Sequence, residues 1–394
     1  MKLSDFSAQS VFIGSLAAFV GFTSSFAVVL QGLRGVGASE AEAASGLMMA
    51  SIGMGLCGIL LSLRAKQPIS VAWSTPGAAL LAGTAVATGG FQAAVGAFIM
   101  CGCLIIMCGI WKPFQRAVSA IPGPLANALL SGILLSLCLA PFKAIAFDPL
   151  LGLPILLAWI VGGWVNRFLG VPCALLAFCI VVLFGVEFPD GWQDMLKTSL
   201  TPQPLWITPV FSIEALLSIA LPLFIVTMAS QNVPGIAVLK ANNYEPRVAP
   251  LLSVTGLFSV LGAPFGAHTV NLAAITAAML TSEEAGPDPN KRYTSAIVCG
   301  IGYLIFGMFA GLTTTFVSLA PAILIEAVAG LALIAAFSAS AVGAFSDPET
   351  RPAAAVTFLA TASGMSIFGI SGAFWGLLGG GLMLALMRYR KSGI

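Results

Sequence analysis

Residues 262–272 read GAPFGAHTVNL, and they interrupt an apolar region with glycine, proline, asparagine and the single histidine of the chain. Residues 67–81, QPISVAWSTPGAALL, repeat the pattern: proline first, then small and hydroxyl-bearing residues, then an Ala-rich run. Proline blocks a continuing helix but is tolerated in a first turn, so Pro76 and Gly77 mark a helix start. We therefore expect two spans in which extended backbone precedes a short half-helix.

The composition places the chain in a membrane. Of 394 residues only 8% are charged, and the mean hydropathy is +1.01. Stretches such as residues 11–30 are apolar on every face, whereas transmembrane strands alternate. The predicted fold class is an all-α polytopic membrane protein with about fourteen transmembrane segments. The expected spans are 11–31, 44–63, 68–87, 91–111, 120–140, 150–168, 171–186, 212–231, 249–262, 264–280, 293–312, 315–337, 352–370 and 372–388.

The distribution of basic residues predicts the orientation. With the amino terminus inside, fourteen of the 17 Lys and Arg residues fall in cytoplasmic segments, and Arg34, Lys143 and Lys197 remain outside. Cytoplasmic loops carry such an excess, so we place both termini in the cytoplasm and the long polar break, residues 187–211, outside. A net charge of +2 is too small to indicate a nucleic-acid partner, and the expected surroundings are membrane lipid.

The chain also divides into two halves around that break. Seven expected spans precede it and seven follow. Because an odd number of spans reverses direction, two similar halves would be related by inversion in the membrane. The third and tenth spans are then counterparts, and these are the two interrupted ones.

Cysteine and histidine usage predicts no metal and no cofactor. The eight cysteines contain no C-x-x-C pair, and no histidine stands at metal-ligand spacing. A membrane enzyme with an intramembrane dyad of Ser74 and His268 is the alternative from another functional class. It is disfavoured, because neither G-x-S-x-G nor H-E-x-x-H occurs.

The two interrupted spans predict a binding site. In hydrocarbon, extended backbone needs protein or a water-filled cavity around it. Half-helix amino termini would bring free N–H groups and positive dipole ends to the membrane midplane, where they suit a carboxylate or another small anion. The alternative is a kinked packing helix whose small residues admit a neighbour. The candidate substrate-binding residues here are Ser74, Thr75 and Gly77 in the third span and Gly266, His268, Thr269 and Asn271 in the tenth.

Within the tenth span, Thr269 or Asn271 could cap the half-helix or donate to substrate. Two further segments offer polar groups to the same site. TMASQNVPG, residues 227–235, ends the eighth span with Gln231 and Asn232, whose amides would contact either substrate or another helix. GFTSSF, residues 21–26, is its counterpart in the first span; Ser24 and Ser25 either line the cavity or bond to their own helix backbone.

Ionisable residues inside spans are functional candidates by default, and they are few. Glu214 lies near a membrane boundary, which favours ordinary solvation. Glu326, in the twelfth span, is a proton site, a partner of a basic residue, or a boundary residue if the span is displaced. His268 has an unperturbed pKa near neutrality. A bound carboxylate would favour its protonation, and by linkage protonation would strengthen anion binding. The alternative for His268 is a cap or a bond to a backbone carbonyl.

The segments QPISVAWSTPGAA, GAPFGAHTVNLAAIT and SQNVPGIAVLKANNY (230–244) together resemble the benzoate/proton symporter family of bacterial inner membranes. That family is similar in architecture to the uracil and xanthine permeases and the sulfate/anion transporters. The resemblance implies a seven-plus-seven inverted repeat, a core domain of residues 1–111 and 212–312, and a gate domain of residues 112–186 and 313–394 that includes a cytoplasmic tail. The extracytoplasmic loop 187–211 joins the halves, and substrate lies between the third and tenth spans.

The expected function is proton-coupled import of benzoate or a related aromatic carboxylate by alternating access. The ring would need an apolar wall from the gate domain and from Phe22, Phe26 or Phe265. Nucleobase permeases of this architecture place glutamates in the eighth and tenth spans; their absence here favours an anion, which a fixed negative charge would repel. The rivals are an uncoupled anion channel or exchanger and a nucleobase permease. The proton carrier stays open between His268 and Glu326, and a homodimer is the other partner considered.

Overall fold

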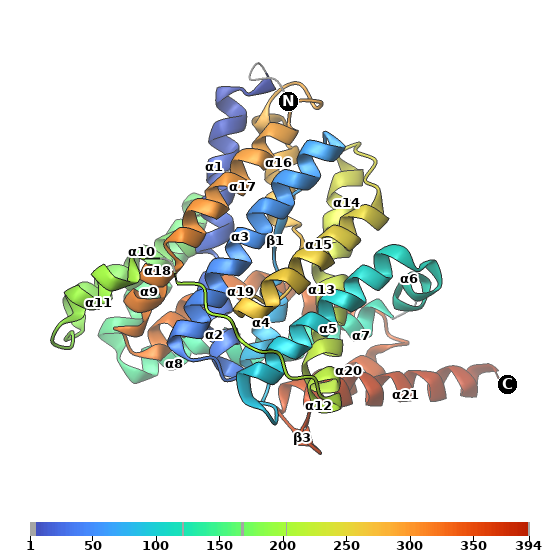
Figure 1. Ribbon diagram of the computed structural model, residues 1–394. Helices are drawn as coiled ribbons and strands as arrows, with labels where there is room; N and C mark the ends of the chain where they lie inside the picture. Colours follow the sequence, from blue (N-terminus) through green and yellow to red (C-terminus); the bar gives the residue numbers. More distant parts are fainter. Residues whose placement is uncertain (1–4, 120–121, 167–168, 202, 393–394) are drawn as a thin grey trace.

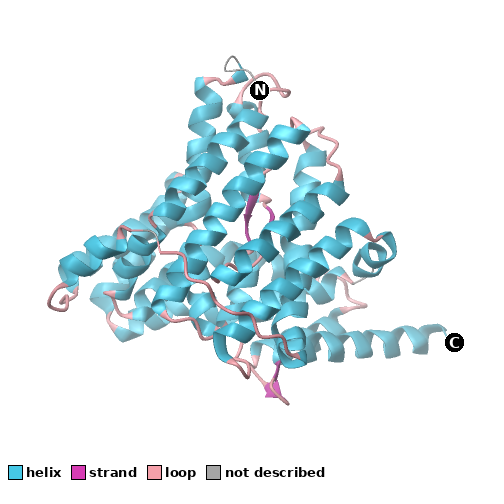
Figure 2. Ribbon diagram, viewed as in Figure 1, coloured by secondary structure: helices cyan, strands magenta, loops and turns pink. Residues whose placement is uncertain are grey.

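The computed structural model describes residues 5–119, 122–166, 169–201 and 203–392, and most of its regular structure is helical (Figure 2). The first half of the chain forms α1 (Ala8–Thr23), α2 (Phe26–Gly35), α3 (Glu40–Ala65), β1 (Val71–Trp73), α4 (Thr75–Ala82), α5 (Gly90–Ile110), α6 (Lys112–Ser119), α7 (Gly123–Cys138), α8 (Ala140–Phe147), α9 (Pro149–Val165) and α10 (Gly170–Gly185). The second half forms α11 (Trp192–Ser199), α12 (Ile213–Ala215), α13 (Leu221–Thr227), α14 (Val233–Ala241), α15 (Val248–Gly262), β2 (Val270–Leu272), α16 (Ile275–Thr281), α17 (Tyr293–Met308), α18 (Ala310–Ser318), α19 (Ala322–Phe345), α20 (Arg351–Ala362), β3 (Ser366–Ile367), β4 (Ile370–Ser371) and α21 (Gly372–Ser392).

The membrane prediction agrees with these helices. Within the described residues, seven helical segments are long and apolar enough to cross a membrane, or eight if the bent pair α17 and α18 counts as one span. The helices α9 and α10 are shorter but apolar. The expected third and tenth spans are strand-and-half-helix segments, as their sequences predict. Lys2 and Arg167, which contributed to the predicted orientation, lie outside the described residues.

Four expected spans differ from the observed elements. The thirteenth, expected over 352–370, is helical only to Ala362 and then forms the β3–β4 hairpin. The first is broken between α1 and α2 at Ser24 and Ser25. The eighth does not end at residue 231 but continues through two π-helical segments, Leu216–Ala220 and Met228–Asn232, to Ala241. The twelfth starts at Ala322 rather than at 315, because the chain first forms the separate helix α18, bent by 52° from α17. Hydropathy alone does not register such bends, since the residues on both sides are apolar.

The two interrupted spans meet at the centre of the molecule (Figures 1 and 2). The strand β1 pairs antiparallel with β2, and Ala72 faces Asn271 in the register. Further backbone bonds of 3.0 Å extend the pair, from Ser74 N to Thr269 O and from Ala273 N to Ser70 O. Each strand therefore satisfies the backbone of the other, which is how extended chain is tolerated at membrane depth.

Helix packing separates into two groups. In one, α3 packs against α15, α17 and α18, and α5 packs against α15. In the other, α7 packs against α19, α20 and α21, and α9 packs against α8 and α10. The half-helix α4 contacts both groups, through α2 and α13 on one side and α7 on the other. The core and gate domains stay a prediction, and their expected boundary after residue 312 would divide α18, which packs with the first group.

Segments expected on one side of the membrane lie together. Tyr244 Oη donates to Pro289 O at 3.0 Å, and Tyr293 Oη donates to Asp5 at 2.6 Å; these segments are all expected in the cytoplasm. Two segments expected outside also lie together: Val210 N, in the loop 203–212, donates to Gln92 O at 3.0 Å. The arrangement is consistent with the predicted alternation of spans.

Candidate functional site

Ser74 builds the amino terminus of α4. It is the N-cap, and its Oγ accepts a hydrogen bond of 3.1 Å from Gly77 N. Pro76 occupies the first turn, where its missing N–H costs nothing. Ser74 Oγ also lies 2.8 Å from Thr227 Oγ1, which anchors the half-helix to α13 of the eighth span. The first half-helix thus begins where the sequence predicts.

The second half-helix begins later than expected. Its start was predicted near His268 to Asn271, but α16 begins at Ile275 with Ala274 as N-cap and no side-chain cap bond. The prediction was wrong because strand β2 uses residues 270–272 to pair with β1. Asn271 therefore lies within the strand, and neither it nor Thr269 caps α16.

A cavity of about 870 Å³ lies beside both half-helix starts. Thr75 and Pro76 of α4 and Ile275 and Thr276 of α16 line one wall, and helices α7, α9, α10 and α19 supply the facing residues. Its lining within the described residues includes no Asp, Glu, Lys, Arg or His. The cavity therefore combines neutral polar side chains and two helix starts with an apolar, aromatic lining.

The predicted binding residues fall into two sets. Those that line the cavity are Ser24, Ser25, Thr75 and Gln231. Those buried behind its wall are Ser74, Gly77, Asn232, Gly266, His268, Thr269 and Asn271. Apart from Gly266, which packs against α3, the second set supports the strand crossing and the start of α4, and only the first set lines the cavity.

Several residues of the buried set have clear structural contacts. Asn232 Oδ1 accepts a hydrogen bond of 3.0 Å from Leu272 N, at the end of β2. A Cβ at Gly77 would overlap the side chain of Leu223. Gly266 has φ +85°, a left-handed conformation that favours glycine, and it packs against α3. These contacts explain why small or amide residues occur there without a ligand.

His268 lies directly behind the start of α4. Its Nε2 is 3.2 Å from the carbonyl oxygen of Ser74, the residue before the cavity-lining Thr75. A carbonyl oxygen only accepts, so the neutral ring carries its hydrogen on Nε2 and presents a lone pair at Nδ1. Nδ1 has no hydrogen-bond partner among the described residues. His268 thus makes the bond to a backbone carbonyl that the sequence analysis considered as its alternative role. An added proton would bind at Nδ1.

Ser24 and Ser25 both bond to helix backbone and line the cavity, which are the two roles considered for them. Their hydroxyls donate to Gly21 O at 3.4 and 3.2 Å, so each bonds to its own helix backbone. Both also line the cavity at the break between α1 and α2. Ser25 Oγ additionally accepts from Trp73 Nε1 at 2.8 Å.

The two membrane glutamates lie away from the cavity. The helix α19 starts at Ala322, so Glu326 lies in its first turns. This agrees with the alternative that Glu326 is a boundary residue of a displaced span. Glu214 accepts a hydrogen bond of 3.0 Å from Thr88 N, in the loop between α4 and α5. Neither lines the cavity.

Sequence reasoning missed some polar lining residues. Asn127 on α7 and Tyr303 on α17 both line the cavity. Asn127 carried a usable signal, since an amide inside an expected span is a candidate interhelical or site group. Tyr303 did not, because a tyrosine in an apolar helix is equally common as a packing residue. The predicted ring contacts Phe22, Phe26 and Phe265 do not line the cavity; Phe22 and Phe26 stack on each other at 5.6 Å.

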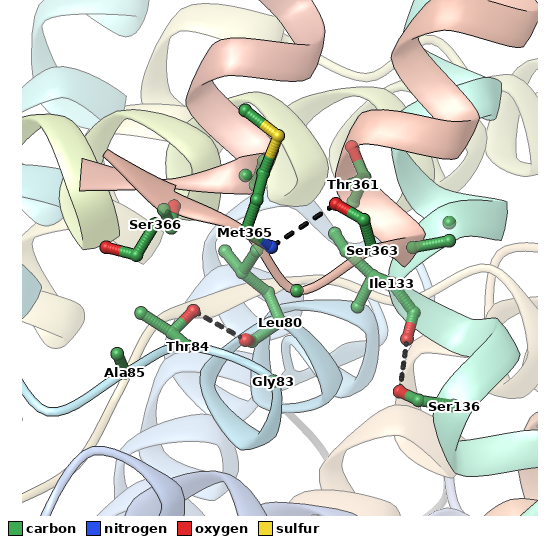
Figure 3. Close-up of a pocket in the computed structure, with 16 residues that line it drawn as sticks. Leu80, Gly83, Thr84, Ala85, Ile133, Ser136, Thr361, Ser363, Met365 and Ser366 are labelled. Atoms are coloured by element: carbon green, nitrogen blue, oxygen red, sulfur yellow. Dashed lines mark hydrogen bonds between the residues drawn. The ribbon is translucent and has the colours of Figure 1, made fainter. Parts of the chain in front are cut away.

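A smaller cavity of about 260 Å³ lies further along α4 and α7 (Figure 3). Thr84 and Ser136 line it, and so do residues that lead from α20 into the β3–β4 hairpin. Its hydroxyls bond locally: Thr84 Oγ1 donates to Leu80 O at 2.8 Å, and Ser363 Oγ accepts from Met365 N at 3.3 Å. This second cavity lies at the carboxyl end of α4, whereas the larger cavity lies at its amino end.

Sequence comparisons identify relatives over the whole chain. The family model described as benzoate membrane transport protein matches residues 4–386. The chain is 38% identical over 391 residues to "Inner membrane protein YdcO" of Escherichia coli, covering 98% of each. It is 33% identical over 391 residues to "Benzoate membrane transport protein" of Acinetobacter baylyi, covering 98% of this chain and 97% of that protein.

Solved structures share the fold at low identity. The transmembrane domain of the cyanobacterial bicarbonate transporter BicA superposes with a TM-score of 0.57 at 15% identity, over 96% of each chain. The murine anion transporter Slc26a9 in an inward-facing state gives 0.61 at 14% identity, over 99% of this chain and 70% of that one. The architecture is the inverted repeat of seven plus seven segments that the two halves predict. On the strength of the family match and the two relatives, this multi-pass membrane protein belongs to the benzoate membrane transport protein family, a family of transporters and not of enzymes.

Proposed function

We propose that this chain imports benzoate or a related aromatic carboxylate together with a proton, by alternating access. The observation that carries the proposal is the cavity beside the starts of α4 and α16, which has aromatic lining and no charged lining residue within the described part of the chain. The positive dipole ends at these helix starts favour a carboxylate. The benzoate transport named for the Acinetobacter relative supports the same substrate class.

The ring of the substrate would pack on indoles. Trp159 and Trp164 of α9 line the cavity and are not fully buried, whereas Trp73 of β1 borders the cavity but is 1% exposed. A flat apolar side chain suits a planar ring, whose burial is favourable by roughly 25 cal/mol per Å² of apolar surface. The wall first expected from phenylalanines is thus proposed to come from tryptophans.

Proton coupling is proposed to act through His268. Protonation at Nδ1 would place a positive charge behind Ser74, next to the α4 start at Thr75. A bound carboxylate and this charge would stabilise each other, and the two binding events strengthen each other by the same factor. Glu326 is the rival carrier, and it is disfavoured because it is not among the residues that line the cavity.

The proposal also covers location and assembly. We place the chain in a bacterial inner membrane, as the name of the Escherichia coli relative supports, with both termini in the cytoplasm. The larger cavity extends toward α10 at Gly170, an end expected on the cytoplasmic side, so the conformation is proposed to be inward-facing. A homodimer stays part of the proposal.

Uptake into proteoliposomes tests the function. Purified protein is reconstituted, and labelled benzoate, bicarbonate, sulfate and uracil are offered with and without an inward proton gradient. We expect benzoate alone to accumulate above equilibrium, and only with the gradient. Equilibration without accumulation would favour the uncoupled channel or exchanger. Uptake of uracil in preference to benzoate would favour a nucleobase permease.

A further inference from the structure

The β3–β4 hairpin is bound to the eighth span by a reciprocal pair of hydrogen bonds. Ser218 Oγ donates to Gly369 O at 3.0 Å, and Ser371 Oγ donates to Ser218 O at 3.0 Å. Ser218 is 2% exposed and Ser371 is 8% exposed, so both hydroxyls are shielded from water. A buried hydroxyl that loses its partner is costly, and these bonds therefore hold the hairpin against the span.

The eighth span is shaped to accept the bond from Ser371. Ser218 lies in the π-helical segment Leu216–Ala220. Pro222 occupies the position whose N–H would bond to Ser218 O in an α-helix, and proline has no N–H. Ser218 O lacks that helical donor, and Ser371 supplies one from outside the span. Such π-helical segments are frequent at functional sites.

The turn of the hairpin brings the second acceptor to the same place. Its central residues, Phe368 and Gly369, have φ of +55° and +75°, which is the pattern of a two-residue type I′ turn. A Cβ at Gly369 would lie only 3.1 Å from the carboxyl carbon of Glu214, so the turn lies close against the start of the eighth span. A left-handed φ is unfavourable for a bulky residue such as Phe368, and it persists only where the surroundings support it.

The two bonds join the two groups of helices beside the smaller cavity. The segment around Ser218 packs against α5 of the first group, and the hairpin connects α20 to α21 of the second. Ser366 and Ser371 of the hairpin line the smaller cavity, together with the carboxyl end of α4 (Figure 3). The eighth span begins after the loop 187–211, so this side is the one expected outside. The groups are thus bonded together at the outer end of α4, while the larger cavity lies at its other end.

We propose that the bonds of Ser218 with Gly369 and Ser371 form an outer latch, which holds the inward-facing conformation and must release before the smaller cavity can open to the outside. The inference rests on the alternating access of the proposed function and names the contact that an outward-facing state has to break. A contact made in only one of two states shifts the population toward that state. Removal of the outer latch should therefore raise the outward-facing population.

Two single cysteines, each in a protein without the native eight, report the conformation in proteoliposomes. Thr84 is 5% exposed and lines the smaller cavity, so Thr84→Cys should react slowly with a membrane-impermeant thiol reagent added outside. Ala335 of α19 is exposed and lines the larger cavity, so Ala335→Cys should react readily from the inside. Adding Ser218→Ala and Ser371→Ala together should raise the outside rate of Thr84→Cys about tenfold, equal to about 1.4 kcal/mol. The inside rate of Ala335→Cys should not rise, because only a general loosening would raise both.

Ser363→Ala is the matched control. Ser363 lines the same cavity, but its Oγ donates to Ala360 O at 2.8 Å and accepts from Met365 N at 3.3 Å, both within its own group of helices. This variant should leave the rate of Thr84→Cys unchanged. Ser371→Thr keeps the hydroxyl donor and should also leave it unchanged. Each single alanine variant of the outer latch should give part of the rise, so the test does not require the double variant to fold.

The outcomes separate the outer latch from the proposed substrate. An unchanged rate for Thr84→Cys in the alanine variants would overturn the outer latch. An equal rise in Ser363→Ala, or a parallel rise in Ala335→Cys, would overturn it as well, since either would indicate general loosening. Benzoate uptake is measured separately on the wild-type protein. If the outer latch behaves as expected and benzoate is not taken up, the proposed substrate fails and the outer latch stands.

Discussion

Trp73 Nε1 donates a hydrogen bond of 2.8 Å to Ser25 Oγ, and this bond ties the central strand of the third span to the break in the first. Trp73 is among the largest fully buried side chains. An indole N–H in that position needs an acceptor, and the broken helix supplies one. The break in the first span is therefore part of the central crossing rather than an isolated irregularity.

Removing that acceptor should destabilise the protein. Ser25→Ala leaves the buried indole N–H unpaired, which costs about 1–3 kcal/mol. Ser24→Ala is the control, because its hydroxyl makes only a 3.4 Å bond to Gly21 O. Denaturant titration in detergent, followed by tryptophan fluorescence, measures the difference. Equal stability of the two variants would show that the Trp73 bond contributes little.

The adjacent amides Gln231 and Asn232 should respond differently to alanine. Asn232 accepts from Leu272 N, so Asn232→Ala should lower stability by about 1–3 kcal/mol. Gln231 lines the cavity, so Gln231→Ala should weaken benzoate binding and leave the melting temperature unchanged. Binding and thermal unfolding are measured on both proteins. The opposite pattern would assign the ligand contact to Asn232.

An acidic residue at position 75 should repel the substrate. Thr75 is the first residue of α4 and lines the cavity, so Thr75→Asp suits the helix dipole and leaves the fold intact. It should weaken benzoate binding at least tenfold more than Thr75→Ala does, because a like charge adds to the lost contact. Equal Kd values for the two variants, measured by calorimetry, would place the carboxylate elsewhere.

Substrate affinity should depend on pH through His268. Protonation adds a positive charge behind the α4 start, so benzoate affinity should rise as the pH falls, and proton uptake should accompany binding. His268→Gln keeps a donor for Ser74 O but cannot gain the charge, so it should flatten both responses. Glu326→Gln serves as the comparison. If it alone flattens them, the carrier is Glu326.

Single cysteines test the topology. In a protein without the native eight, Lys197→Cys in α11 should react with a membrane-impermeant reagent only from outside, and Lys291→Cys only from inside. Both side chains are well exposed. Reaction of Lys197→Cys from the cytoplasm alone would reverse the predicted orientation.

Much of the fold could be predicted from local sequence signals, such as the residues that start and end a helix. The start of α4 is an example: Ser74 and Pro76 are a cap and a first-turn residue wherever the helix packs. The existence of a second interrupted span followed equally from Pro264 and Gly266. These features are local, and local chemistry determines them.

The start of α16 could not be predicted in that way. Thr269 and Asn271 look like caps in isolation, but β2 pairs with a strand about 200 residues away, and that pairing takes their segment. The same long-range pairing decides that Asn232 bonds to a backbone and Gln231 faces the cavity. Which side of a helix faces a cavity depends on its neighbours, and the sequence of one span does not contain them.

The uncharged lining of the large cavity has an electrical consequence. A membrane potential performs work on moving charge, about 2.3 kcal/mol per elementary charge for each 100 mV. The empty cavity carries no charged lining side chain within the described residues, so its side chains bring no net charge across the field when the carrier reorients. A carboxylate that travels with one proton is also neutral. Reorientation in such a cycle would not depend on the membrane potential, and uptake would follow the pH difference alone.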